Sequence, residues 1–149
     1  MEKRPLIKIF LDEMEANGHP NVRALNNKTL EFTKETNLTE EGDCILGLRA
    51  SKGCADLSPQ LKDAIHQGRK IRVELWANEI RDFFIGWGDP ELTLTNINSV
   101  VFRMSDFKCD RTILIKCNKA AFHIEQKIAR FMQKAENKLR IKFYLLQSC

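Results

Sequence analysis

The chain repeats itself, and this repetition constrains its fold more than any other feature of the sequence. Three matched segments recur in the same order at offsets of 70, 67 and 68 residues, which chance rarely produces. They are a Gly-x-Pro turn, an aspartate followed nine residues later by a lysine, and an alternating strand: Gly18–Val22 with Gly88–Leu92, Asp43–Lys52 with Asp110–Lys119, and Ile71–Leu75 with Leu139–Phe143. We interpret this pattern as an internal duplication.

Each repeat is predicted to contain a strand, the Gly-x-Pro turn, two strands, a helix and a last strand. The length suits one domain, residues 1–149, with internal repeats at about 5–75 and 76–146 paired around a pseudo-twofold axis. The predicted fold class is α+β with mostly antiparallel strands and two helices, one per repeat. Because closure removes exposed strand edges, we expect a β-barrel-like domain, closed or nearly closed.

Alternating apolar and polar side chains locate the strands. We expect eight of them: Leu6–Glu15, Thr29–Thr33, Cys44–Ala50, Ile71–Trp76, Ile80–Trp87, Val100–Arg103, Thr112–Cys117 and Leu139–Leu146. Ser58 is the predicted N-cap of the first helix, with Pro59 at the first helical position and Gly68 at the end. A longer second helix is predicted to begin after Asn118 and to run to about Ala135.

Positive charge is concentrated near the end of the chain. The net charge is +4, whereas residues 1–75 balance 12 basic against 12 acidic side chains. The excess comes from six residues opposed only by Glu136: Lys127, Arg130, Lys134, Lys138, Arg140 and Lys142. Such a surface attracts an anion or a nucleic-acid backbone, or it is simply a solvated face that keeps the protein soluble.

Membrane, metal and cofactor sites are not indicated by the sequence. No segment reaches the roughly 18 uncharged apolar residues of a membrane span. The five cysteines contain no C-x-x-C pair, so we expect free thiols in an intracellular, cytoplasmic protein without a cofactor. We predict no metal site, because Cys109, Cys117 and His19 would converge only by tertiary accident. The sequence does not indicate the oligomeric state.

Duplication predicts that equivalent polar residues meet near the axis. These form three pairs: Asp43 with Asp110, Lys52 with Lys119, and His19 with Asp89. A histidine facing an aspartate suits acid–base chemistry. The structural alternative is that each aspartate caps turn amides and bonds the lysine nine residues on, so that it ties a strand to its helix, and that His19 is a hydrogen-bonded turn residue.

Several motifs resemble one uncharacterised family, domain-of-unknown-function family three hundred and seventy-one, which is common in archaea and found in some animals. The resemblance covers about residues 12–146, and its family name implies no established activity. The motifs are G-H-P-N-V at 18–22, T-L-E-F-T at 29–33, L-T-E-E-G-D-C-I-L-G at 38–47, G-D-P-E-L-T-L-T at 88–95, S-D-F-K-C-D-R-T at 105–112 and K-A-A at 119–121.

The chain departs from that family pattern at five positions. The resemblance implies a histidine near Asn26, a threonine at Lys28, aspartates at Ser51 and Asn118, and an arginine at Trp87. If the family is catalytic through those groups, this member is weakened or only binds. The polar positions that are retained are His19, Thr29, Glu31, Asp43, Asp89, Arg103, Ser105, Asp106, Asp110, Arg111 and Lys119.

Six polar side chains lie within ten positions of the second repeat: Arg103, Ser105, Asp106, Asp110, Arg111 and Thr112. Arginine binds phosphate or carboxylate through paired hydrogen bonds, and the hydroxyl and carboxyl groups can assist or orient it. We therefore predict a binding module for an anionic partner, either RNA or a phosphorylated or carboxylated ligand. Its predicted ligand-binding residues are Arg103, Ser105, Asp106, Arg111, Thr112, Lys119, Asp43 and Lys52.

The alternative is a small-molecule hydrolase or lyase in which His19, Asp89 and Asp110 act as acid and base. The sequence leaves open whether the chain is an enzyme, since it has neither a phosphate loop nor a G-x-S-x-G elbow. A third hypothesis is a protein-binding scaffold that exposes some of four aromatic residues, most of which we expect in the core: Trp76, Phe83, Phe84 and Trp87.

Overall fold

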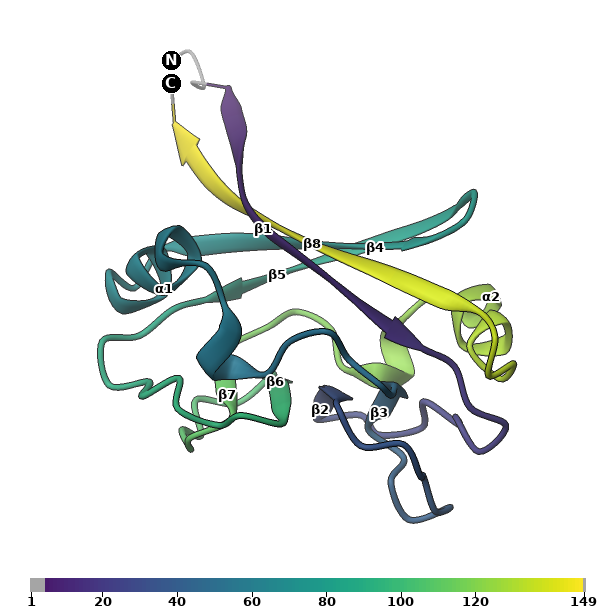
Figure 1. Cartoon of the computed structure of the whole chain (residues 1–149). Coiled ribbons are helices and arrows are strands. Elements are labelled where there is room, and N and C mark those ends of the chain that lie inside the picture. The colour runs from purple at the N-terminus through teal and green to yellow at the C-terminus, as the bar shows by residue number, and fades with distance from the viewer. Residues whose placement is uncertain (1–4, 149) are drawn as a thin grey trace.

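The computed structural model describes residues 5–148, which form two four-stranded sheets and two short helices (Figure 1). Sheet A is antiparallel, with the strand order β1-β8-β4-β5. Its strands are β1 (Leu6–Asn17), β8 (Lys138–Ser148), β4 (Lys70–Ala77) and β5 (Ile80–Trp87). The predicted strands are confirmed here, although three of them are longer than expected.

Sheet B has the order β3-β2-β6-β7. Its two central strands are antiparallel, and each outer strand is parallel to its neighbour. The strands are β3 (Ile45–Gly47), β2 (Thr29–Thr33), β6 (Ser99–Arg103) and β7 (Thr112–Leu114). The two outer strands are much shorter than the predicted segments.

The α+β fold class is confirmed, but no closed barrel forms within residues 5–148. The strands of residues 5–148 form two separate sheets. Single bridge pairs, Asn17 with Leu48 and Trp87 with Ile115, join sheet A to the residues that follow β3 and β7. Strands β3 and β7 have only three residues each, so they end before they could pair continuously with the strands of sheet A.

The two halves of the described chain contain the same elements in the same order. In sheet B, Glu31 lies opposite Val101, 70 residues later. In sheet A, Glu74 lies opposite Lys142, 68 residues later. These offsets match the repeat in the sequence, so a twofold axis relating the halves passes through both pairs.

The first helix follows the prediction. Helix α1 spans Pro59–His66, and the hydroxyl of its N-cap Ser58 accepts a hydrogen bond from the Leu61 amide at 3.1 Å. A 3-10 turn, η1 (Cys54–Asp56), precedes it. In Figure 1, α1 and α2 lie at opposite ends of the molecule.

The second helix is much shorter than predicted. Helix α2 spans only Gln126–Phe131 and its N-cap is Glu125, after a 3-10 turn, η2 (Ala121–His123). Asn118 is not a cap, because strand β5 binds it. The side-chain oxygen of Asn118 accepts a hydrogen bond from the Ile85 backbone amide at 2.9 Å, and the backbone amide of Asn118 donates to the Ile85 carbonyl at 3.0 Å.

The core lies between the inner faces of the two sheets. Four fully buried phenylalanines link the layers: Phe32, Phe84, Phe102 and Phe143. The Phe84 and Phe102 rings meet edge to face with centroids 5.0 Å apart, a geometry that aromatic pairs favour. The equivalent turn glycines, Gly18 and Gly88, pack so closely on the ends of α2 and α1 that an added Cβ would clash with backbone carbonyls.

Candidate functional site

Lys52 forms a bridge, but not with the predicted Asp43. Its ammonium lies 2.6 Å from a carboxylate oxygen of Asp12 in β1. The other oxygen of Asp12 accepts a hydrogen bond from the Ser58 amide at 2.8 Å. The buried Asp12 carboxylate therefore ties the first strand to the start of α1, which is a structural role.

Lys119 makes the equivalent bridge in the second half, and its partner is Asp82 rather than the predicted Asp110. The Lys119 ammonium lies 2.6 Å from Asp82 in β5, and the other carboxylate oxygen accepts from the Glu125 amide at 2.9 Å. Lys52 and Lys119 are thus engaged in two matching ties.

Asp43 and Asp110 accept side-chain hydrogen bonds from equivalent asparagines. The Asn26 amide donates to Asp43 at 3.2 Å, and the Asn96 amide donates to Asp110 at 3.3 Å. The Asn26 oxygen also accepts from the backbone amide of Thr29 at 2.9 Å. Asn26 is therefore a turn residue in this protein.

The expected pairing of His19 with Asp89 is wrong. The His19 ring accepts a hydrogen bond from the Asn21 amide at 3.0 Å, and Asp89 accepts one from the Glu91 amide at 2.8 Å. Each side chain therefore caps its own turn. The two turns pack on different helices at opposite ends of the molecule, so no acid–base pair forms.

Arg103 lies among the predicted partners but is already engaged. Its Nε donates to the buried Thr112 hydroxyl at 2.8 Å, and its Nη2 lies 3.4 Å from the Cys109 sulfur. The guanidinium also covers the Phe107 ring, 4.8 Å from the centroid. These contacts engage two of the five guanidinium N–H groups and hold Arg103 against its own loop.

The remaining members of the predicted cluster make separate local contacts or are exposed. The Ser105 hydroxyl accepts from the Phe107 amide at 3.2 Å, and Asp106 is exposed. Arg111 is exposed and lies 4.0 Å from the buried Glu31 carboxylate. Asp106, Asp110 and Glu31 also offset the charge of the two arginines, so this region is not strongly cationic.

The thiol of Cys109 lies among hydrogen-bond donors that lower its pKa. Burial alone would raise the pKa of its thiol, but hydrogen bonds from Thr112, the Arg111 backbone and Arg103 outweigh burial and lower the pKa to about 7. Among the described residues the other free thiols are Cys44, Cys54 and Cys117, and burial raises their pKa to about 11, 12 and 12.

A cationic surface lies on the outer face of sheet A, the face that points away from the core. Successive side chains along each strand point to opposite faces of the sheet, so every second side chain points outward. The basic residues on it are Lys8, Lys70, Arg72, Arg81, Lys138, Arg140 and Lys142, against the acidic Glu13, Glu15 and Glu74. This leaves a formal excess of four positive charges on one face. In Figure 1 both helices lie at the ends of this sheet and not across its outer face.

Aromatic side chains lie between these cations. The Lys142 ammonium is 3.4 Å from the centroid of the Trp76 ring, and the Arg81 guanidinium is 4.0 Å from it. The Arg72 guanidinium lies 3.7 Å from the Phe83 centroid. Phe83 and Trp87 remain 42% and 41% exposed, so parts of their rings are open to a ligand.

This face is also hollowed. Three shallow pockets of about 340, 330 and 400 Å³ lie along it. Arg72 and Lys8 line two of them, and Trp76 and Arg81 also line two. The hollows therefore adjoin one another, and each is lined by three basic side chains, with Glu74 and Asp82 also lining one and Glu15 another.

Glu74 organises the centre of the outer face. Its carboxylate accepts three hydrogen bonds, from Lys8 at 2.7 Å, Arg72 at 2.8 Å and the Trp76 indole at 3.0 Å. Burial alone would raise the pKa of Glu74, but these hydrogen bonds outweigh burial and lower the pKa to about 2. The group is therefore ionised at neutral pH and fixes the positions of two cations.

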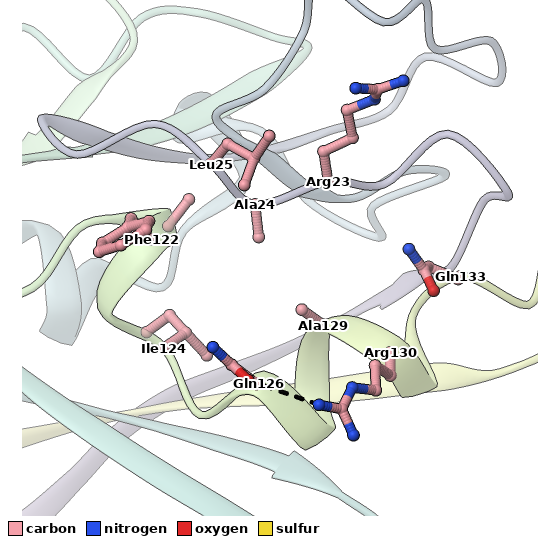
Figure 2. Close-up of a pocket in the computed structure, with 10 residues that line it drawn as sticks. Arg23, Ala24, Leu25, Phe122, Ile124, Gln126, Ala129, Arg130 and Gln133 are labelled. Carbon is pink, nitrogen blue, oxygen red and sulfur yellow. Dashed lines mark hydrogen bonds between the residues drawn. The ribbon is translucent and has the colours of Figure 1, made fainter.

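A separate pocket of about 180 Å³ lies beside α2 (Figure 2). Its walls come from the turn after β1, from η2 and from α2. Polar groups in its lining are Arg23, Gln126, Arg130 and Gln133. In Figure 2 the Arg23 and Arg130 guanidinium groups lie on opposite sides of the pocket, and Gln126 bonds to Arg130.

Two further findings concern residues 5–148. No group of three or more His, Cys, Asp or Glu side chains in that range is placed to hold a metal ion. No helix there is both long enough and apolar enough to cross a membrane.

The outer face was not singled out from the sequence as a site. The alternation of Arg140, Lys142 and Tyr144 with apolar residues was visible, as was the basic end of the second repeat. The missing information was strand pairing, which brings Arg72 and Trp76 of β4 beside them. Alternation in β4 was the available signal, but it does not identify the neighbouring strand.

Comparison with known proteins supports the resemblance seen in the sequence. The family described as "Domain of unknown function (DUF371)" matches residues 14–146. The chain is also similar to a protein of Methanocaldococcus jannaschii named "Uncharacterized protein MJ0206". The two are 37% identical over 123 residues, which cover 83% of this chain and 91% of that protein. Neither name states an activity.

Proposed function

We propose that this chain, which belongs to the DUF371 family, is a binding module for an anionic partner, and that the partner is single-stranded RNA. The observation that carries the proposal is the outer face of sheet A, where seven basic and three acidic side chains surround exposed aromatic rings. Single-stranded nucleic acid is bound by this combination, because cations contact the phosphates and aromatic rings stack on the bases.

Two cations on this face have no carboxylate partner among the ion pairs of residues 5–148. Glu74 engages Lys8 and Arg72, Glu13 engages Arg140 and Lys142, and Glu15 lies 3.9 Å from Lys138, whereas Lys70 and Arg81 form no such pair within the described residues. A cation without an internal counter-charge contributes most to attracting phosphate. We therefore assign Lys70 and Arg81 as principal phosphate contacts.

The base contacts are assigned to the exposed aromatic rings. Phe83 carries the Arg72 guanidinium on one side, and guanidinium planes are themselves stacking surfaces for bases. Trp87 lies beside Lys70, with the ammonium 5.8 Å from the ring centroid. Each stacked base contributes on the order of 1–3 kcal/mol and tolerates any sequence, so we expect little sequence preference.

The Arg103 and Arg111 cluster supports the proposal less well than the outer face. Arg103 already bonds to Thr112 and Cys109, and Arg111 lies near Glu31. An enzymatic role is not proposed, since His19 and Asp89 each cap a separate turn.

Salt dependence tests the proposal. Fluorescence anisotropy of a short labelled oligouridine should report binding whose affinity rises as salt falls from roughly 0.2 to 0.05 M, because binding releases counterions. Phe83→Ala should weaken binding about tenfold through lost stacking, while Phe107→Ala, which removes an exposed ring elsewhere, should leave it unchanged. Affinity that is absent or insensitive to salt would sink the proposal.

A further inference from the structure

We propose that the pocket beside α2 is a second ligand site, which takes a small organic anion carrying one compact apolar group. The inference is independent of RNA binding, because none of the outer-face cations or aromatic residues lines this pocket. It arises from comparing two equivalent regions, the junction of α1 with η1 (the α1 corner, or first corner) and the junction of α2 with η2 (the α2 corner, or second corner), where the duplicated backbone framework corresponds but several side chains differ.

Two hydrogen bonds of the framework at the α1 corner have counterparts at the α2 corner. At the α1 corner the Ala55 amide donates to the Asn96 carbonyl, and at the α2 corner the Phe122 amide donates to the Asn26 carbonyl, at 3.0 and 2.9 Å. A second pair of hydrogen bonds also corresponds: His66 with the Leu92 carbonyl at 2.8 Å, and Gln133 with the Val22 carbonyl at 3.1 Å. Each corner therefore holds the same turn against the same helix.

Lys62 occupies the α1 corner with its own side chain. Its ammonium donates to the Ala55 carbonyl at 2.7 Å, so the alkyl chain runs along the junction of α1 and η1. The residue 67 positions later is Ala129, and the carbonyl equivalent to that of Ala55 belongs to Phe122. Replacing a lysine by alanine removes four side-chain heavy atoms, and the pocket of about 180 Å³ lies at this position.

The charge at the two corners also differs. Asp63 and Thr93 of the first corner correspond to Arg130 and Arg23 of the second, and both arginines line the pocket. Arg23 has only a surface partner, with its Nη2 3.2 Å from Glu40, whose side chain is 75% exposed. Such a surface pair contributes little and is readily exchanged for a ligand. The pocket therefore favours an anion where its counterpart holds an ammonium.

The size and lining define the rest of the ligand. A cavity of about 150 Å³ accepts a benzene ring, so this pocket has room for one ring or a short branched chain. Ala129 and Ile124 line the floor, and the Phe122 and Leu25 side chains, both more than half exposed, form one end. The acid group would lie toward Arg23 or Arg130, which flank the apolar floor in Figure 2.

Three probes of similar shape and different charge test the site by amide chemical-shift mapping: benzoate, phenyl phosphate and benzylamine. Benzoate or phenyl phosphate should shift the amides of η2, α2 and residues 23–25, and the stronger of the two identifies the acid class. Benzylamine should not, because it brings a cation to two arginines. Equal shifts from benzylamine, or shifts spread over the whole surface, would overturn the proposal.

Two variants distinguish a specific loss of ligand binding from a loss of folding. Ala129→Lys installs the first-corner side chain and should abolish the benzoate-induced shifts by filling the pocket. Arg130→Gln, at an exposed position that leaves the pocket volume open, should weaken binding about tenfold through loss of one charge-assisted contact. Lys62→Ala, the matched control, should open the first corner without creating an anion site, since Asp63 remains. Unchanged benzoate binding in both second-corner variants contradicts the assignment.

Discussion

The acidity of each cysteine in this protein follows from the groups around its sulfur. Cys54 and Cys117 are buried, and burial raises the pKa of their thiols to about 12. Cys109 is only partly buried and lies against Thr112 and Arg103, whose hydrogen bonds lower its pKa to about 7. At neutral pH, Cys109 therefore carries a large thiolate fraction while the buried sulfurs carry almost none.

Iodoacetamide should label Cys109 first among the four described cysteines, with a rate that rises to half its maximum near pH 7. Thr112→Val should shift that midpoint upward, because it removes a hydrogen bond that stabilises the thiolate. Peptide mass spectrometry against pH checks both points. Uniform labelling of all four thiols in the folded protein would contradict this account.

Glu74 should make stability depend on pH between about 4.5 and 2. Its pKa is lowered in the folded protein, so its contribution is complete above the ordinary value of 4.5 and is lost as pH falls through about 2. The shift corresponds to on the order of 3 kcal/mol. Urea unfolding of Glu74→Gln at pH 7 should show a loss of that order.

The same variant should lose little further stability from this source between pH 4.5 and 2, whereas the unmodified protein loses it progressively. Glu79→Gln, an exposed position in the turn between β4 and β5, serves as the control. Parallel pH curves for the Glu74→Gln variant and the unmodified protein would mean that the hydrogen bonds to Glu74 contribute nothing.

At the scale of elements, strands were easier to predict than the second helix. Period-two alternation is a local signal, and β2 and β5 have the predicted bounds. Ile124, Ile128 and Met132 recur every four residues and are buried, as on one face of a helix, yet only part of that segment is helical. The reason is tertiary. Strand β5 bonds to Asn118, and Asp82 bonds to Lys119 and to the Glu125 amide, so the chain cannot form a helix before Gln126.

The Asp12 and Asp82 carboxylates should contribute equally to the stability of the fold, because each accepts hydrogen bonds from a lysine and from a backbone amide at the start of a helix. Asp12→Asn and Asp82→Asn should each destabilise the protein by about 3 kcal/mol, since a partly buried lysine loses its charge partner. Urea denaturation midpoints measure this. Asp106→Asn, at an exposed position, should have no effect, and a large difference between the two tie variants would contradict their equivalence.

At the scale of the whole molecule, the repeat predicted which elements recur but not which residues form a surface. One alternative predicted that Asp43 bonds Lys52, nine residues on, and so ties a strand to its helix, whereas Lys52 bonds to Asp12, 40 residues earlier. The outer face combines residues from β1, β8, β4 and β5, whose order in sheet A no local pattern specifies. Strand order is decided by long-range pairing, so this surface became visible only in three dimensions.

The central claim is that the outer face of sheet A binds single-stranded RNA, and matched charge reversal tests it most directly. Lys70→Glu with Arg81→Glu changes the net charge by as much as Lys127→Glu with Lys134→Glu, which lie at and beyond α2. Oligouridine affinity at low salt should fall more than tenfold in the first variant and stay within about threefold in the second. Equal losses in both variants, or none in the first, would contradict the assignment of this face.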